Sequence, residues 1–142
     1  MTETKVLIDD GMCFGCGKDN PIGLKLDFDF DGEIYSTTYM PEKTHQGWSN
    51  RTHGGMLALV LDELLSRVVL VQHGLDWVTV ELNTRLIKPA PVGRRLDVRT
   101  KVESVRGRLI TATGEVVDHE TGLIVATGSA KLMRAKPISI GA

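Results

Sequence analysis

A carboxylate inside an apolar stretch is the group in this sequence best suited to chemistry. The stretch from Met56 to Leu70 reads MLALVLDELLSRVVL, and Asp62 and Glu63 interrupt it. Arg67 stands four residues after Glu63, so these two residues predict an ordinary ion pair on a helix. Asp62 has no basic residue three or four positions away, and burying an unpaired carboxylate is costly. Asp62 is therefore a candidate catalytic base, with a structural capping role as the plain alternative.

The start of the same stretch suits a carbonyl substrate. His53 is followed by Gly54 and Gly55, and glycines let a ligand approach the backbone. The free N–H groups and the dipole of a helix N-terminus favour developing negative charge, as an oxyanion hole requires. We expect the His53 ring to hold the loop through hydrogen bonds, with a direct role in the chemistry as the alternative.

The spacing of these groups predicts a site shared by two chains. Gly54 and Asp62 are eight residues apart, which corresponds to about 12 Å along a helix. Groups that attack and polarise one carbonyl must both lie within about 3 Å of it. Two antiparallel helices in a C₂ dimer would bring one helix start beside the Asp62 of the other chain. The expected assembly is a homodimer, or a dimer of dimers (homotetramer), with equivalent shared sites.

Cys13 and Cys16 form a C-x-x-C pair in the run CFGCG. A tetrahedral zinc site needs four ligands, and a redox dithiol usually lies between a strand and a helix. The chain has no second cysteine pair, and the turn-forming residues KDNPIG follow the first. We expect a structural turn with no catalytic metal and no cofactor. Metal or redox chemistry is the alternative, and a metal site shared across two chains is one form of it.

Composition places the chain of 142 residues among ordinary globular proteins of one domain. With 17 Lys and Arg against 18 Asp and Glu, no strong field favours nucleic acid or an anionic membrane. Charged residues interrupt the longest apolar stretch, which argues against a membrane span, and the first residues lack the pattern of a secretory signal. We expect a cytoplasmic protein that binds neither nucleic acid nor membrane.

The surrounding patterns predict the elements that position these groups. Residues 54–73 contain few breakers and end at Gly74, so they predict a helix. Alternation over residues 24–30, a turn at Asp31 and Gly32, and residues 33–40 predict a hairpin. Four β-branched segments predict antiparallel strands at residues 77–87, 94–105, 108–117 and 123–133. The predicted fold is α+β, with a curved antiparallel sheet wrapped around one long buried helix. It forms a single domain over residues 1–142, with residues 1–12 as a candidate loose N-terminal extension.

Three runs of the sequence resemble one family. HQGWSNRTHGGMLALVLDE, CFGCGKDNPIGLKLDF and VTVELNTRLIKPAPVG are similar to the hotdog-fold acyl-CoA thioesterases of the phenylacetic-acid-degradation (PaaI-like) type. They cover most of residues 13–93, and the strand pattern extends the similarity to Met133. The resemblance implies a hotdog fold, dimers that join their sheets edge to edge, and hydrolysis of an acyl-CoA to a free acid and CoA.

The resemblance also implies roles for single residues. Gly55 or its neighbour Gly54 would donate a backbone N–H to the thioester carbonyl. Asp62 would act as base or nucleophile from the opposite subunit, and Ser66, one turn later, would help to place water. Thr79 would correspond to a strand Ser or Thr near the site.

Residues near the helix start are candidates for substrate contacts. Gly47 stands where many relatives carry Asn or Gln, and Gln46 or Asn50 is the candidate replacement. The expected acyl pocket includes Trp48, Met56, Leu59 and Trp77. The phosphates of CoA require cations, for which the candidates are Arg94, Arg95, Lys131, Arg134 and Lys136.

The leading function is therefore an acyl-CoA thioesterase. The alternative is a non-catalytic module that binds or senses acyl-CoA on the same fold, which would keep the pocket but not need Asp62. A hydratase of this fold would need a catalytic Asp–His pair, which we do not find in the sequence.

Overall fold

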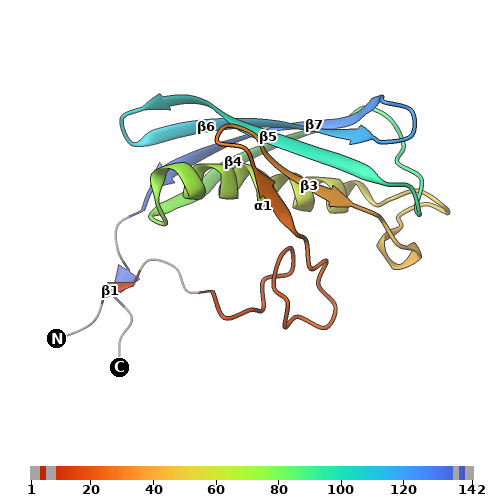
Figure 1. Ribbon diagram of the computed structural model, residues 1–142, viewed down its shortest axis with the longest axis horizontal. Helices are drawn as coiled ribbons and strands as arrows, with labels where there is room; N and C mark the ends of the chain where they lie inside the picture. The colour runs from red at the N-terminus through yellow and green to blue at the C-terminus, as the bar shows by residue number, and fades with distance from the viewer. Residues whose placement is uncertain (1–3, 6–8, 136–137, 140–142) are drawn as a thin grey trace.

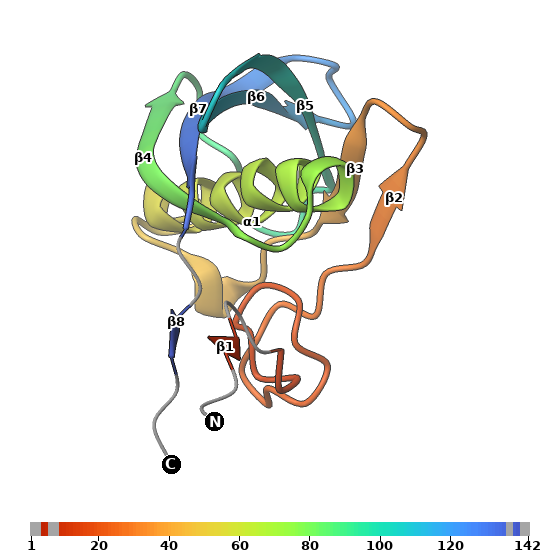
Figure 2. The ribbon, with the colours of Figure 1, turned by 90° about the vertical axis from the view of Figure 1, so that its left-hand side faces the viewer.

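The computed structural model describes residues 4–5, 9–135 and 138–139. Six strands form one antiparallel sheet in the order β2-β3-β5-β6-β7-β4, and the long helix α1 (Gly54–His73) lies against its concave face (Figure 1). Figure 2 shows the sheet curving around α1 from β2 and β3 on one side to β4 on the other. The strands of this sheet are β2 (Phe28–Phe30), β3 (Tyr35–Tyr39), β4 (Trp77–Leu86), β5 (Leu96–Arg106), β6 (Leu109–Asp118) and β7 (Ile124–Arg134). The predicted α+β architecture is confirmed.

The remaining elements are short. The 3₁₀ helix η1 (Lys43–His45) precedes α1, and β1 (Thr4–Lys5) pairs with β8 (Ile138–Ser139) outside the main sheet. The sequence suggested a loose N-terminal extension over residues 1–12. Of these, residues 1–3 and 6–8 lie outside the described residues. Within the part of the chain that the structure describes, no helix is both long enough and apolar enough to cross a membrane.

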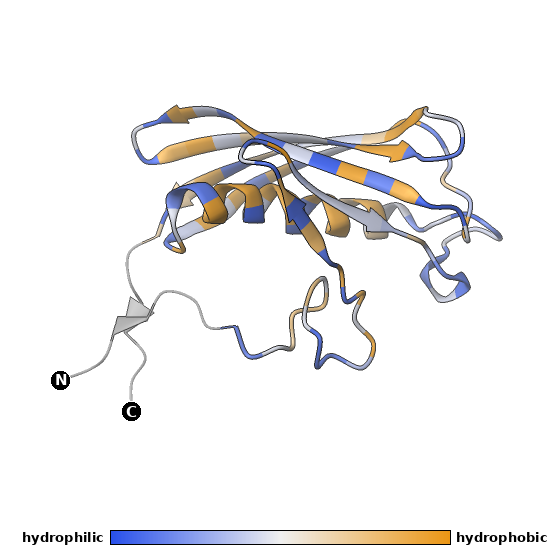
Figure 3. Ribbon diagram, viewed as in Figure 1, coloured by the Kyte–Doolittle hydropathy of each residue, from blue (hydrophilic) through white to orange (hydrophobic). Residues whose placement is uncertain are grey.

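The predicted helix over residues 54–73 is confirmed as α1. Gly74, with φ 102°, ends it and donates its N–H to the Leu70 carbonyl at 3.0 Å. The buried side chains recur every three or four residues and form the face that packs on the sheet. They are Leu57, Val60, Leu61, Leu64, Leu65, Val68 and Val69. Figure 3 shows the matching alternation of hydrophobic and hydrophilic residues along β5, where one strand face points to the helix.

Small residues line the sheet where α1 lies closest. Thr100, Gly114 and Gly128 are register neighbours on β5, β6 and β7. A Cβ atom on Gly114 would lie 2.6 Å from Cγ2 of Thr100, and one on Gly128 would lie 3.1 Å from Cδ1 of Leu61. Glycine at these two positions therefore leaves room for the Leu61 side chain against the sheet.

The first hairpin strand is shorter than predicted. Alternation suggested a strand over residues 24–30, but β2 contains only Phe28–Phe30. Lys25 adopts a left-handed conformation (φ 52°), and the N–H groups of Leu24 and Leu26 donate to the carbonyls of Phe14 and Gly15. This part of the alternating run pairs with the N-terminal loop, because that loop supplies the backbone partners.

Candidate functional site

The first turn of α1 presents the backbone N–H of Gly54 to a ligand. His53 is the N-cap residue, and its Nδ1 accepts from the N–H of Gly55 at 2.9 Å. The carbonyl of His53 accepts from the N–H of Met56, also at 2.9 Å. Among the described residues, the N–H of Gly54 has no such partner. Gly54, rather than Gly55, therefore offers the free donor at this helix start.

A pocket of about 670 Å³ opens beside this donor. Gly54 lines it together with Trp48, Leu57, Leu86 and Ile87. The Trp48 side chain is 86% exposed at its rim. The pocket thus combines an apolar lining with a helix N-terminus, as a site for the carbonyl of an apolar acyl group requires.

The capping bond of His53 gives a test of its structural role. We expect His53→Ala to lower the free energy of unfolding by about 1 kcal/mol, because the N–H of Gly55 loses its acceptor. His53→Asn is the matched control, since asparagine is a good N-cap residue and restores an acceptor. Thermal unfolding followed by circular dichroism measures both variants. Equal stability of His53→Ala and the wild type would show that the bond contributes nothing.

Asp62 is half-buried in the middle of α1, and no hydrogen bond or ion pair joins its carboxylate to another described residue. Burial raises the pKa of Asp62, and the charge of the neighbouring Glu63 acts in the same direction. Glu63 itself pairs with Arg67, whose Nε lies 2.9 Å from Oε1, so the predicted i,i+4 ion pair is confirmed. Glu63 is thus held in an ion pair, whereas the Asp62 carboxylate is free to take a proton from a reacting group.

Two hydroxyl candidates lie near the middle of the helix. Ser66 is half-buried one turn after Asp62, and Thr79 is half-buried on β4, against which α1 packs. The pairing of β4 with β7 shifts register between Thr79 and Glu81. Such β-bulges often re-aim side chains beside active sites. Gly54 remains two helical turns away, about 12 Å along the axis.

A second, larger cavity lies on the other side of the helix start. Its volume is about 1300 Å³, and its lining includes Met56 of α1, Leu26, and Arg95. Two of the expected acyl-pocket residues, Leu59 and Trp77, line neither cavity. Trp77 is only 6% exposed and donates its Nε1–H to the His73 carbonyl at 3.3 Å. Trp77 is therefore a core residue near the C-terminal end of α1, and its place in the acyl pocket stays a prediction.

The candidate cations for the CoA phosphates already have acidic partners. The N···O distances are 2.6 Å for Arg94–Asp118, 3.2 Å for Arg94–Glu120, 3.0 Å for Arg95–Asp97, 3.3 Å for Lys131–Glu81 and 2.6 Å for Arg134–Asp76. Lys136 lies outside the described residues. Arg95 is the best placed, because its side chain is 47% exposed and it lines the same cavity as Met56.

The two amide candidates help to shape the loop before α1. Oε1 of Gln46 accepts from the backbone N–H of Asn50 at 3.2 Å. Asn50 has φ 60°, a left-handed conformation that asparagine tolerates well. Gly47, which stands between them in the chain, lines the smaller pocket.

The C-x-x-C loop lies against α1 at Glu63, on the side away from the sheet (Figure 2). Burial raises the pKa of the Cys16 thiol to about 12, and a hydrogen bond with Glu63 adds to the effect. Such a thiol is not an activated nucleophile. Sequence reasoning missed this contact because fifty residues separate Cys13 from Glu63. It also missed Leu86 and Ile87 at the smaller pocket, for which strand periodicity gives no signal.

Comparison with known proteins gives a family and several similar folds. The model of the thioesterase superfamily matches residues 50–125, just over half of the chain. The crystal structure of a thioesterase superfamily protein is similar with a TM-score of 0.75 and 27% identity over 84% of this chain, which spans 61% of that protein. Zebrafish thioesterase superfamily member 2 gives a TM-score of 0.75 at 19% identity, covering 87% of this chain and 91% of its own.

The PaaI protein from the phenylacetic acid degradation operon of E. coli is also similar. Its TM-score is 0.70 at 20% identity, covering 78% of this chain and 84% of its own. No curated protein sequence matches the chain. The structural matches confirm the predicted hotdog fold.

Proposed function

Because the chain belongs to the thioesterase superfamily, we propose that it hydrolyses an acyl-CoA thioester to a free acid and CoA. The observation that carries this proposal is that one helix presents both a backbone N–H and a carboxylate that have no partner among the described residues. The N–H of Gly54 is free at a pocket, and the carboxylate of Asp62 is half-buried without a partner among the described residues. An acyl transfer to water needs one donor for the oxyanion and one base or nucleophile.

The proposed reaction uses both groups on the same thioester carbonyl. The N–H of Gly54 donates to the thioester oxygen and stabilises the negative charge that develops there. In one route, Asp62 of the partner subunit takes a proton from water, and the oxygen of this water bonds to the carbonyl carbon. In the other route, an Asp62 oxygen bonds to this carbon and forms an acyl–Asp62 anhydride, which water later hydrolyses to the free acid and the Asp62 carboxylate. The C–S bond then breaks, and the sulfur of CoA leaves with the electron pair and takes up a proton. Ser66 and Thr79 would place the water.

The edge strand β4 supports a dimeric site. In the described sheet β4 pairs only with β7, so one side of this ten-residue strand carries unpaired N–H and C=O groups. Three of its apolar side chains are also exposed: Val80 at 55%, Leu82 at 37% and Leu86 at 58%. A second copy of β4 pairing across this edge would extend the sheet and cover these side chains. It would also bring the second α1 close enough to supply Asp62.

The two cavities divide the proposed substrate contacts. Trp48 at the smaller pocket and Met56 at the larger one would contact the acyl group or the pantetheine arm. Arg95 would bind a phosphate of CoA in place of Asp97, and Arg94 would do so only after leaving two acidic partners. Asn50 would contribute through the shape of the loop.

A panel of acyl-CoA substrates tests this function. Short, medium, long and aromatic acyl-CoAs are incubated with the protein, and released thiol is measured with a chromogenic disulfide reagent. We expect turnover on at least one member, abolished by heat denaturation of the protein. Equilibrium dialysis with the same compounds runs in parallel. Tight binding without thiol release would instead support the acyl-CoA binding module.

A further inference from the structure

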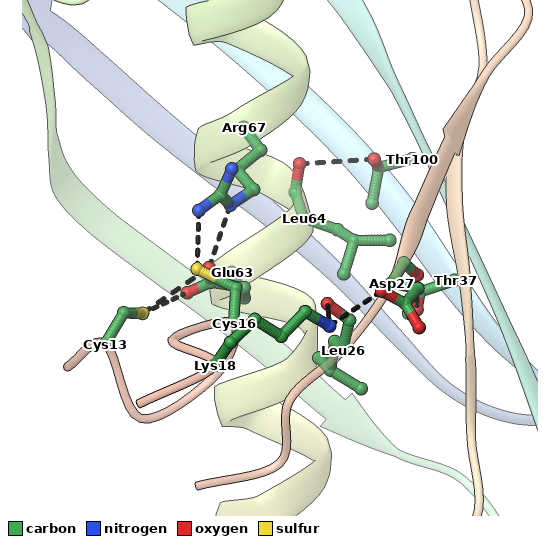
Figure 4. Close-up of polar contacts among 10 residues, drawn as sticks. All are labelled: Cys13, Cys16, Lys18, Leu26, Asp27, Thr37, Glu63, Leu64, Arg67 and Thr100. Atoms are coloured by element: carbon green, nitrogen blue, oxygen red, sulfur yellow. Dashed lines mark hydrogen bonds and ion pairs between the residues drawn. The ribbon is translucent and has the colours of Figure 1, made fainter. Parts of the chain in front are cut away.

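A cluster of sulfur and oxygen atoms joins the N-terminal loop to the middle of α1 (Figure 4). Sγ of Cys13 lies 3.6 Å from each carboxylate oxygen of Glu63. Sγ of Cys16 accepts from Nη2 of Arg67, whose Nε donates to Glu63. The two sulfurs and a carboxylate oxygen all lie within 4.8 Å of one another. Three potential metal ligands therefore converge from segments that are far apart in the sequence.

The backbone builds this cluster without help from the sulfur atoms. Gly17 donates its N–H to the Cys13 carbonyl at 2.8 Å and closes a turn around the two cysteines. A Cβ atom on Gly17 would lie 2.3 Å from the carbonyl oxygen of Gly11, and one on Gly15 would lie 2.9 Å from the Glu63 carboxylate. Glycine at position 17 is thus required for the turn, and glycine at position 15 lets the turn approach Glu63 without displacing its side chain. The two thiols are held in place before any ligand arrives.

The geometry and the donor set fit zinc. Zn–S and Zn–O bonds of about 2.3 and 2.0 Å place tetrahedral S and O ligands about 3.5 Å apart, and the observed Cys13–Glu63 distance is 3.6 Å. Two thiolates and a carboxylate are ligands that zinc accepts in proteins, with water as the fourth. The sequence favoured a metal-free turn because it has no second pair of cysteines. Glu63, the third ligand, becomes visible only in the folded chain.

Charge balance gives Arg67 a part in the same site. Binding of Zn²⁺ by two thiols releases two protons, so the centre of one metal ion, two thiolates and a carboxylate carries a charge of −1. The guanidinium of Arg67 neutralises it, and its hydrogen bonds to Glu63 and Cys16 are those of an outer partner that orients metal ligands. Phe28 holds Arg67 there, with its ring centroid 4.8 Å from Cζ.

We propose that Cys13, Cys16 and Glu63 bind one Zn²⁺ per chain, which fastens the N-terminal loop to α1. The site is structural: it lies on the side of the helix away from the sheet, and Gly54 is not part of it. The proposal is independent of thioester hydrolysis and needs no change in the proposed catalytic groups.

Cobalt substitution tests the site directly. The full chain is purified under reducing conditions, stripped with a chelator and titrated anaerobically with Co²⁺. We expect one Co²⁺ per chain, a thiolate-to-cobalt charge-transfer band in the near ultraviolet, and the intense visible bands of a tetrahedral centre, all removed by Zn²⁺. This measurement needs no variant. Absence of the charge-transfer band in reduced wild type, or recovery of a Cys13–Cys16 disulfide that never yields a metal complex on reduction, would overturn the proposal.

Variants then identify the ligands. We expect Cys13→Ser and Cys16→Ser each to weaken Co²⁺ binding by at least about 100-fold, and Glu63→Gln to weaken it by about 10- to 100-fold. Glu103→Gln is the matched control, because Glu103 is an exposed glutamate on β5. Zinc should raise the unfolding temperature of the wild type and of this control only. Equal affinity in Cys13→Ser and the control would reject Cys13, and with it the proposed site.

Discussion

Asp62→Asn is expected to keep the fold and to lower kcat on any accepted acyl-CoA by at least about 10²-fold. The amide has nearly the same shape as the carboxylate but cannot take the proton of water or attack the thioester carbon. No described residue bonds to the Asp62 carboxylate, so the exchange breaks no structural contact. Steady-state release of CoA from the best substrate of the panel measures the effect.

Stability separates this catalytic role from a structural one. A half-buried carboxylate without a partner costs folding free energy, so Asp62→Asn should unfold at the same temperature as the wild type or at a higher one. Binding of the substrate should change little, because the chemical step is what loses its base. A folded Asp62→Asn protein with near wild-type kcat would show that Asp62 has no catalytic role.

The helix and the sheet could be predicted from the sequence because their signals are local. The length of the apolar stretch and the stop at Gly74 predicted a helix over residues 54–73, and the structure confirms it. The four later strands alternate or carry β-branched residues, and short turns join β5 to β6 and β6 to β7. The expectation that consecutive strands are neighbours fails for β4, which pairs with β7 and not with β5. The first hairpin was overextended for a non-local reason: Leu24 and Leu26 bond to the N-terminal loop, and no periodicity in the sequence reports that pairing.

The candidate site was predictable only in part. Asp62 stood out because its helical neighbours at three and four positions carry no positive charge. The choice between Gly54 and Gly55 could not be made from the sequence, because it depends on which N–H the His53 ring occupies. The burial of Trp77 could not be predicted either, because its packing depends on how β4 lies against α1. The partners of Arg94 and Arg95 are likewise set by the tertiary fold.

Gly54→Pro is expected to lower kcat/KM by about 10²- to 10³-fold, because it deletes the proposed oxyanion donor, the N–H of Gly54. Proline is favoured at the first helical position, and His53, at ψ 132°, already has the extended backbone that a following proline requires. Gly54→Ala is the matched control. It adds a Cβ beside Cδ1 of Leu86, as proline does, but keeps the N–H. The Leu86 side chain is 58% exposed and can move aside, so alanine should retain most activity. Equal loss in both variants would assign the effect to the added carbon.

Mixing the two inactive variants decides whether the site is shared. In a hybrid dimer, the Asp62→Asn chain supplies an intact Gly54 and the Gly54→Pro chain supplies an intact Asp62, so one of the two sites is complete. Random mixing makes about half of the dimers hybrid, and about a quarter of wild-type activity should return. Hybrids isolated through two different tags should reach about half. If each site used Gly54 and Asp62 of a single chain, every chain in the hybrid would carry one defect and no activity would return. Verified hybrids as inactive as their parents would therefore contradict the dimeric site, while the separate effects of Asp62→Asn and Gly54→Pro would still test the two groups themselves.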